Sequence, residues 1–215
     1  MAISPAYAQE ILVEAPRIDE NATDSSRSTS VLGPEAVLPE RAATISSLLR
    51  AVPGLDVAQQ GGPGQTTSIF IRGARSEDTL VLIDGIEVND PMSPSSGFDF
   101  SSLSPDNVER IEVYRGPQGV RFGAGALGGV INIVTTEGQG PAKLKYLAEG
   151  GSYRSFREGL GVSGQHEAFA YSLGLSHVQS RGFSAAATSY GNTEADGILS
   201  SAASTKLRWE LPSRL

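Results

Sequence analysis

The stretch "RFGAGALGGVINIVTT", Arg121 to Thr136, decides between two folds. Gly123, Gly125 and Gly128 follow the order G-x-G-x-x-G, the spacing of a dinucleotide-binding loop. That loop needs a buried strand before its first glycine and a helix after its third. Here glycine, proline and arginine precede the loop, and the β-branched "VINIVTT" that follows favours a strand. We therefore predict a turn that leads into a strand over residues 130–136, and no nucleotide site.

Other candidate sites of catalysis are equally weak. The glycine-rich segment at residues 61–68, "GGPGQTTS", has Gln65 where a phosphate-binding P-loop has lysine. The histidines, His166 and His177, have no carboxylate at ligand spacing, and the chain contains no cysteine. We expect a protein that is not an enzyme.

Composition limits the class of protein. The 215 residues include 24 acidic and 17 basic side chains, for a formal charge of −7. Such a surplus of acid argues against nucleic-acid binding, which needs a basic face. No run of 18 apolar residues predicts a transmembrane helix, so a membrane protein would have to be a β-barrel.

The N-terminal segment contains two signals. Residues 6–8, "AYA", match a signal-peptidase site, which makes residues 1–8 a signal-peptide remnant. The basic and apolar regions that should precede it are missing, so either the start is placed too late or the match is chance. Residues 10–15, "EILVEA", have extended character, and the polar residues 17–30 predict a flexible tether. Order is expected from Val31.

The middle of the chain predicts a small α+β domain. Residues 44–52 place four apolar side chains on one face of a short helix, which Pro53 and Gly54 end. Asp84-Gly85 predicts a type I′ hairpin. The predicted strands, each apolar and bounded by turn residues, are Leu55–Gln59, Ser68–Arg72, Thr79–Ile83, Ile86–Val88, Val108–Tyr114 and Val130–Thr136.

Beyond Pro141 the pattern alternates between large apolar and small or charged side chains. It does so over residues 142–149, 166–178 and 205–211. A barrel wall between lipid and lumen alternates in this way, and so does a soluble antiparallel sheet with one face on a core. The alternation leaves both interpretations open, although Tyr146 and Trp209 near strand ends favour a membrane-interface girdle.

Two long segments resemble the plug domain of TonB-dependent outer-membrane receptors. They are "SIFIRGARSEDTLVLIDGIEVND" (Ser68–Asp90) and "NVERIEVYRGPQGVRFGAGALGGVINIVTT" (Asn107–Thr136). Phe122 stands where the family usually has tyrosine. The resemblance extends from about Glu10 to the C-terminus and implies a plug at residues 31–138.

The resemblance also assigns a role to the N-terminal segment. "EILVEA" resembles a TonB box, with Glu14 where threonine is common, and residues 9–30 become TonB box plus tether. It implies that the partner TonB, energised by ExbB–ExbD, pairs with this segment as an added strand. On its residues alone the segment has an alternative interpretation as a flexible N-terminus of the mature protein. The predicted TonB-box residues are Glu10, Ile11, Leu12, Val13, Glu14 and Ala15.

Two arginines are predicted to fasten the plug. Arg72 in "IRG" and Arg115 in "RGP" match plug arginines that, in the family, reach acidic residues on the inner barrel wall. The alternative is local ion pairing with Glu109 or Glu112 within the plug.

Within the family the chain is most similar to vitamin B12 (cobalamin) receptors. "SRGFSAAATSYGNTEADGILSSAAS" resembles their early extracellular loop. There acidic residues bind Ca²⁺, so Asp196 and Glu194 are candidate ligands, although "NTEAD" is also an ordinary polar loop and two carboxylates cannot complete a Ca²⁺ site. No other cofactor is expected. Candidate substrate contacts in the apical loops are Gln60, Gln65, Asp90 and Met92.

The expected fold class is an α+β plug with a small mixed sheet, followed by about four antiparallel strands of a truncated transmembrane β-barrel at residues 139–215. A plugged barrel has about 22 strands, so we expect a fragment that does not transport a small-molecule substrate by itself. The expected location is the outer membrane of a Gram-negative bacterium, with the plug in the lumen and the TonB box in the periplasm. A siderophore or haem receptor, which carries a ferric chelate, and a soluble periplasmic binding or signalling module remain alternatives.

Overall fold

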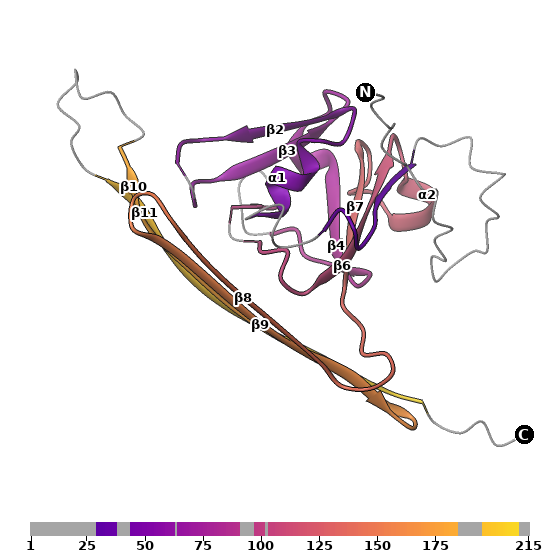
Figure 1. Ribbon diagram of the computed structural model, residues 1–215. Coiled ribbons are helices and arrows are strands. Elements are labelled where there is room, and N and C mark those ends of the chain that lie inside the picture. Colours follow the sequence, from indigo (N-terminus) through magenta and orange to yellow (C-terminus); the bar gives the residue numbers. More distant parts are fainter. Residues whose placement is uncertain are drawn as a thin grey trace, which may run out of the picture.

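The computed structural model describes residues 29–37, 44–62, 64–90, 97–101, 103–184 and 195–210. Figure 1 shows an α+β body and, beside it, a long thin sheet of four strands, which we call the wall. The elements of the body are β1 (Thr29–Leu32), α1 (Ile45–Leu49), β2 (Leu55–Gln59), β3 (Thr67–Ile71), η3 (Ser76–Asp78), β4 (Thr79–Ile83), β5 (Ile86–Glu87), β6 (Val108–Arg115), α2 (Gly119–Phe122) and β7 (Gly129–Thr135). The wall consists of β8 (Lys143–Gly151), β9 (Ser155–His166), β10 (Phe169–Phe183) and β11 (Asp196–Trp209).

A five-stranded mixed sheet forms the centre of the body. Its strand order is β1-β6-β7-β4-β5, with β4 and β7 parallel and the other neighbours antiparallel. β4 and β5 are joined at Asp84 and Gly85, whose φ angles of 50° and 80° fit the predicted type I′ turn. The predicted strands of the plug are confirmed, with ends that differ from the prediction by at most one residue.

The first strand lies where the sequence predicts a tether. Thr29 pairs with Tyr114 and Leu32 with Ile111, so order begins before Val31. Thr29 and Ser30 carry no hydrophobic signal. They are ordered because β6 supplies hydrogen-bonding partners for their backbone, which no local pattern reveals.

One apolar core lies between the sheet and the layer formed by α1 and the β2–β3 hairpin. The helix is shorter than predicted, and Thr44 caps it by accepting a hydrogen bond from the Ser47 amide. No helix in the described residues is long and apolar enough to cross a membrane. The buried core residues are Val37, Ile45, Leu49, Val52, Ile69, Ile71, Val81, Phe100, Ile111, Val113, Ile131 and Ile133.

The glycines at the start of β7 allow backbones to approach closely. A Cβ on Gly128 would lie 2.7 Å from Ala74 Cβ, and a Cβ on Gly129 would collide with the Tyr114 carbonyl oxygen. Gly123 ends α2 with a φ of 95°, which favours glycine. The order is therefore helix, bend and strand, which is the reverse of a dinucleotide site, and the predicted strand is confirmed.

The wall strands are longer than the alternating segments of the sequence. The segment predicted at 166–178 is wrong at its start: His166 ends β9, and a turn at Glu167 and Ala168, where Glu167 has a φ of 51°, leads into β10. β11 begins well before the predicted segment at 205–211 and pairs with β10, with a register shift between Ser180 and Phe183. The strand order is β11-β10-β9-β8, antiparallel throughout.

The two faces of the wall differ in chemistry. The face toward the body carries small and polar side chains, and Ser172 there is only 2% exposed. The outer face carries the large apolar side chains, and Trp209 there is 68% exposed. The apolar face is turned away from the core, so the wall is not a soluble sheet packed on a core, and the predicted fold class is confirmed. The exposed apolar residues of the outer face include Leu144, Tyr146, Leu173, Leu175, Leu199 and Leu207.

Candidate functional site

The body and the wall meet in a polar seam built around two glycines of the wall. The loop before β6 carries Asp106 and Asn107, which lie against Gly159 and Gly174. A Cβ on Gly159 would lie 3.1 Å from Asp106 Oδ1, and one on Gly174 would lie 2.9 Å from Asn107 Cβ. The side-chain amide of Asn107 donates to Ser204 Oγ over 2.7 Å. The loop is thus seated where the wall has no side chains.

Arg157 joins this loop to the wall by charge. Its Nη2 donates to Asp106 Oδ1 over 2.7 Å, and its Nη1 lies 3.4 Å from Glu149 Oε2 on the neighbouring strand β8. The side chains of Arg157 and Asp106 are 6% and 11% exposed. Of the ion pairs between body and wall in the described residues, this pair is the most buried, so its Coulomb attraction is screened little.

A second ion pair joins the body to the wall. Lys206 Nζ lies 3.1 Å from Asp84 Oδ1, and Asp84 also accepts from the Thr135 amide over 2.9 Å. Burial acts to raise the pKa of the Asp84 carboxyl, but hydrogen bonds from Thr135 and Lys206 outweigh it and hold that pKa below its usual value. Arg208 forms an ion pair with Glu137 where the chain leaves the body.

The predicted latch arginines lie together at another place on the body. Arg72 follows β3 and Arg115 ends β6, and a Cβ on Gly54 would lie 3.4 Å from Arg115 Cδ and 3.8 Å from Arg72 Cγ. Arg115 donates to Ser30 Oγ over 2.5 Å. Burial, and then the charge of Arg72, lower the pKa of Arg115. Like charges side by side favour an acidic partner, but whether the barrel supplies it stays a prediction.

The alternative local pairs involve Glu109 and Glu112. Glu112 accepts from Arg110 over 2.8 Å and from the Tyr114 hydroxyl over 3.1 Å. Glu109 lies 3.7 Å from Arg110. Both carboxylates therefore have Arg110 as their ion-pair partner in the structure.

One predicted substrate loop reaches the wall. Gln60 and Gln65 close the β2–β3 hairpin, where the backbone amide of Gln60 donates to the Thr66 carbonyl over 3.0 Å. A Cβ on Gly64 would lie 2.7 Å from Ile198 Cδ1, which places the tip of this hairpin against β11. Candidate substrate and candidate Ca²⁺ segments, far apart in sequence, are thus neighbours.

The structure describes two of the remaining predicted site residues, Asp196 and Asp90. Asp196 begins β11 opposite Phe183, and Asp90 is exposed after β5. Glu194, Met92 and the TonB-box residues 10–15 lie outside the described residues. Within the described part of the chain no three His, Cys, Asp or Glu side chains gather as metal ligands.

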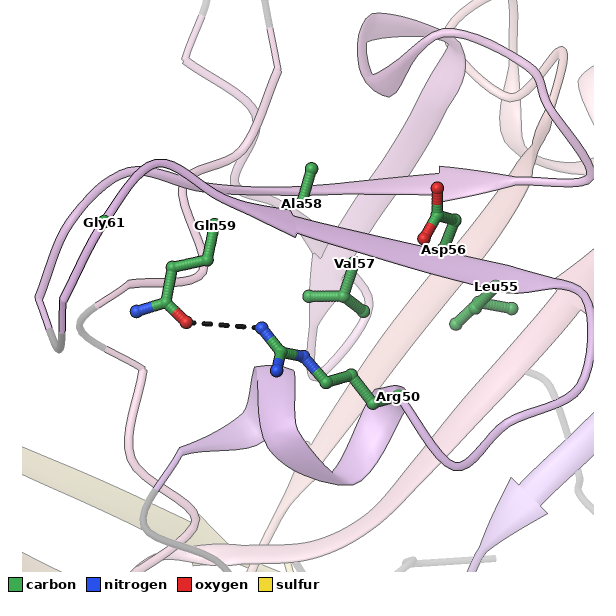
Figure 2. A pocket seen from close by; sticks show the side chains of 7 residues that line it. All are labelled: Arg50, Leu55, Asp56, Val57, Ala58, Gln59 and Gly61. Atoms are coloured by element: carbon green, nitrogen blue, oxygen red, sulfur yellow. Dashed lines mark hydrogen bonds between the residues drawn. The ribbon is translucent and has the colours of Figure 1, made fainter. Parts of the chain in front are cut away.

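A shallow groove of about 730 Å³ runs along β2 (Figure 2). Arg50, just past α1, donates to Gln59 Oε1 over 3.3 Å across it. β2 pairs only with β3 in the described residues. The groove is polar and open, and its residues include none of the predicted substrate contacts.

Comparison with known families matches residues 21–130 to the TonB-dependent Receptor Plug Domain. This match covers just over half of the 215 residues. The chain belongs to this family. The body is its plug, and the predicted recognition is confirmed.

Individual relatives agree with the plug family. The chain is 34% identical over 143 residues to the vitamin B12 transporter BtuB of Vibrio vulnificus, an alignment covering 64% of this chain and 23% of the transporter. The siderophore receptor PirA of Acinetobacter baumannii is similar in structure, with a TM-score of 0.65 and 28% identity over 85% of this chain and 29% of that one. A mutant of the ferric enterobactin receptor PfeA of Pseudomonas aeruginosa, in complex with enterobactin, has a TM-score of 0.64 and 26% identity over 85% and 31%. The aligned part of the chain thus spans about a quarter of the length of this transporter.

The plug–wall seam is the functional feature that sequence reasoning misses. Asp106 and Arg157 lie outside the family segments, and Asn107 is only the first residue of the second one. Alternation places Arg157 and Gly159 on one face of β9, but only the structure shows that this face turns toward the plug. A buried arginine beside a glycine on that face indicates a charged partner from the plug.

Proposed function

We propose that this chain forms the plug and first wall strands of a TonB-dependent receptor for energy-coupled uptake across the outer membrane of a Gram-negative bacterium. The observation that carries the proposal is the polarity of the wall. Its large apolar side chains point outward, and its small and polar side chains meet the plug through ion pairs and hydrogen bonds. Such a wall suits lipid on one side and an aqueous, plugged lumen on the other.

The dimensions of the wall support this proposal. Aromatic pairs lie at both ends of β10: Phe169 with Trp209 at 5.7 Å between ring centroids, and Phe183 with Tyr153 at 5.5 Å. The strand has 15 residues, so its ends lie about 46 Å apart at about 3.3 Å per residue. A barrel tilt of about 35–45° reduces this to about 32–38 Å along the membrane normal, slightly more than a hydrocarbon core of about 30 Å. Both pairs then lie in the interfaces.

The substrate we propose is cobalamin. The 34% identity with a vitamin B12 transporter supports it. In this proposal the hairpin tip with Gln60 and Gln65, together with the loop that carries Asp90 and Met92, contacts the substrate. Asp196 and Glu194 would contribute to Ca²⁺ binding beside that hairpin, a position supported by the contact of Gly64 with Ile198.

Coupling to energy would run through the N-terminal segment. Residues 10–15 pair with TonB as an added strand, and TonB is driven by ExbB–ExbD. Pulling on this segment loads the plug through its tether and β1. Arg72 and Arg115 would hold the plug to acidic residues of the barrel until that load arrives.

The test is uptake by cells that produce the receptor carrying these residues and no other cobalamin receptor. We expect cyanocobalamin to be accumulated in a tonB⁺ strain and only bound at the surface in a tonB⁻ strain. Deleting residues 10–15 should reproduce the tonB⁻ result, whereas deleting an equal length of the tether, residues 20–25, should not. Uptake that does not depend on TonB would contradict the proposal.

A ferric chelate is the second candidate substrate. The siderophore receptors named above support it, since their structures are similar to this chain at 26–28% identity. Direct binding of cyanocobalamin and of ferric enterobactin to the purified receptor separates the two. Saturable binding of the ferric chelate alone would replace cobalamin, and recovery of the protein in the soluble periplasm would favour a binding or signalling module instead.

A further inference from the structure

Arg157 lies between two carboxylates that belong to different parts of the receptor. Asp106, 2.7 Å away, is on the plug, and Glu149, 3.4 Å away, is on the wall. Glu149 is directly opposite Arg157 in the pairing of β8 with β9, so it stays beside Arg157 wherever the plug is. The seated plug thus shares one arginine with the wall's own acid.

We propose that Arg157 is a releasable anchor. It holds the seated plug through an ion pair with Asp106, and it pairs with Glu149 instead when the plug leaves. This inference rests on the proposed function, because it describes the step in which the plug is displaced. Breaking a buried ion pair by removing one partner is costly, so an arginine that lost the carboxylate of Asp106 with nothing in its place would oppose release. A second carboxylate on the wall removes that obstacle.

The geometry distinguishes the two carboxylates in the seated state. Asp106 makes the shorter contact and is 11% exposed, and its loop is fixed by the fit against Gly159. Glu149 is 41% exposed and at the longer distance, where water competes for it. Glu149 is therefore weakly engaged while the plug is seated. Directly opposite residues on neighbouring strands are close enough to pair once Asp106 is gone.

The two carboxylates should affect release in opposite directions. Neutralising Asp106 weakens the seated state alone, because a displaced Asp106 is in water. Neutralising Glu149 weakens the released state more than the seated state, since only the released state depends on it. A static network would instead lose stability in the same direction from either change.

The experiment uses one cysteine as a reporter. The chain has no native cysteine, and Ser172, 2% exposed, lies on the wall beneath Asn107. Ser172→Cys is placed in the receptor that carries these residues, purified in detergent, and maleimide labelling is timed in urea too dilute to unfold the wall. We expect Asp106→Asn to raise the labelling rate at least tenfold and Glu149→Gln to lower it at least threefold.

Controls separate charge from packing. Glu158→Gln changes a neighbouring acid on the opposite face of β9 and should leave the rate unchanged. Gly159→Ala displaces Asp106 without altering charge and should raise the rate. In an Asp106→Asn background, Arg157 pairs with Glu149 in both states. Adding Glu149→Gln there should have no effect, and this comparison needs only that the parent Asp106→Asn receptor folds.

Two labelling results would refute the proposal. If Glu149→Gln raises the labelling rate or leaves it unchanged in the otherwise native seam, the change of ion-pair partner from Asp106 to Glu149 is refuted. If it slows labelling equally with and without Asp106, Glu149 acts independently of the plug and the proposal also fails. Labelling requires neither substrate nor TonB, so a wrong substrate assignment would not alter these results.

Discussion

Replacing Gly129 by alanine should destabilise the plug strongly. A Cβ there would collide with the Tyr114 carbonyl oxygen and would lie 2.8 Å from Ile71 Cδ1. One collision partner is backbone, which cannot rotate away, and the other belongs to the core. Overpacking of this kind costs about 1–3 kcal/mol. The φ of 157°, which residues with a side chain rarely adopt, adds about 1–2 kcal/mol.

The assay is hydrogen exchange of the β7 amides in detergent-solubilised protein, followed by mass spectrometry. β7 is the middle strand of its sheet, so its amides exchange through opening of much of the plug. A loss of about 2–5 kcal/mol corresponds to exchange about 30-fold to a few thousandfold faster. Wall amides in β10 serve as an internal reference and should change little.

Gly125→Ala is the matched control in the same stretch. A Cβ there would lie 3.7 Å from Leu80 Cδ1, an ordinary contact. Exchange in β7 should be unchanged or up to about fivefold slower, because alanine reduces the freedom of the unfolded chain. Exchange within threefold of the native rate for Gly129→Ala would refute the reasoning, and so would equal acceleration by both variants.

Three further outcomes are expected. The pKa of Asp84 is lowered in the folded state, so its contribution to the free energy of unfolding is present above the unfolded pKa of about 4 and is lost as the pH falls through the lower folded pKa. The urea concentration needed to open the seam should therefore fall in acid, and it should fall less in Asp84→Asn. Leu175→Arg puts a charge on the outer face and should cost about 2–4 kcal/mol in urea-titrated folding into phospholipid vesicles, unless that face avoids lipid. Thr44→Ala removes the α1 cap and should cost about 0.5–2 kcal/mol, measured by amide exchange in α1, whereas Thr44→Ser should retain most of the stability.

The plug could be predicted from sequence because its strands carry local signals. The "VINIVTT" run is β-branched and sits in the sheet within one residue of the prediction. Asp84-Gly85 specifies its own turn through two positive φ angles. Such features depend on a few neighbouring residues, so no tertiary information is needed to find them.

Features that depend on distant partners were not predictable in this way. β1 is ordered by pairing with β6, about eighty residues later. In β9, Gly159 leaves room for Asp106, a residue about fifty positions earlier in the chain. The seam joins Asn107 to Ser204, 97 residues later, and no local pattern predicts that contact. The residues of the seam fit one another in shape and charge across the interface, and a single sequence does not show which residues face each other there.

The distribution of apolar residues explains how a plug can be both stable and displaceable. The apolar core of the plug contains only plug residues, and the large apolar side chains of the wall face outward. No described core cluster includes residues of both parts. Displacing the plug therefore exposes ion pairs and hydrogen bonds, which water can replace at a net cost of about 0.5–1.5 kcal/mol for a typical hydrogen bond. A shared apolar core would have no such substitute, because water does not replace apolar contacts, and a plug held in that way would resist displacement.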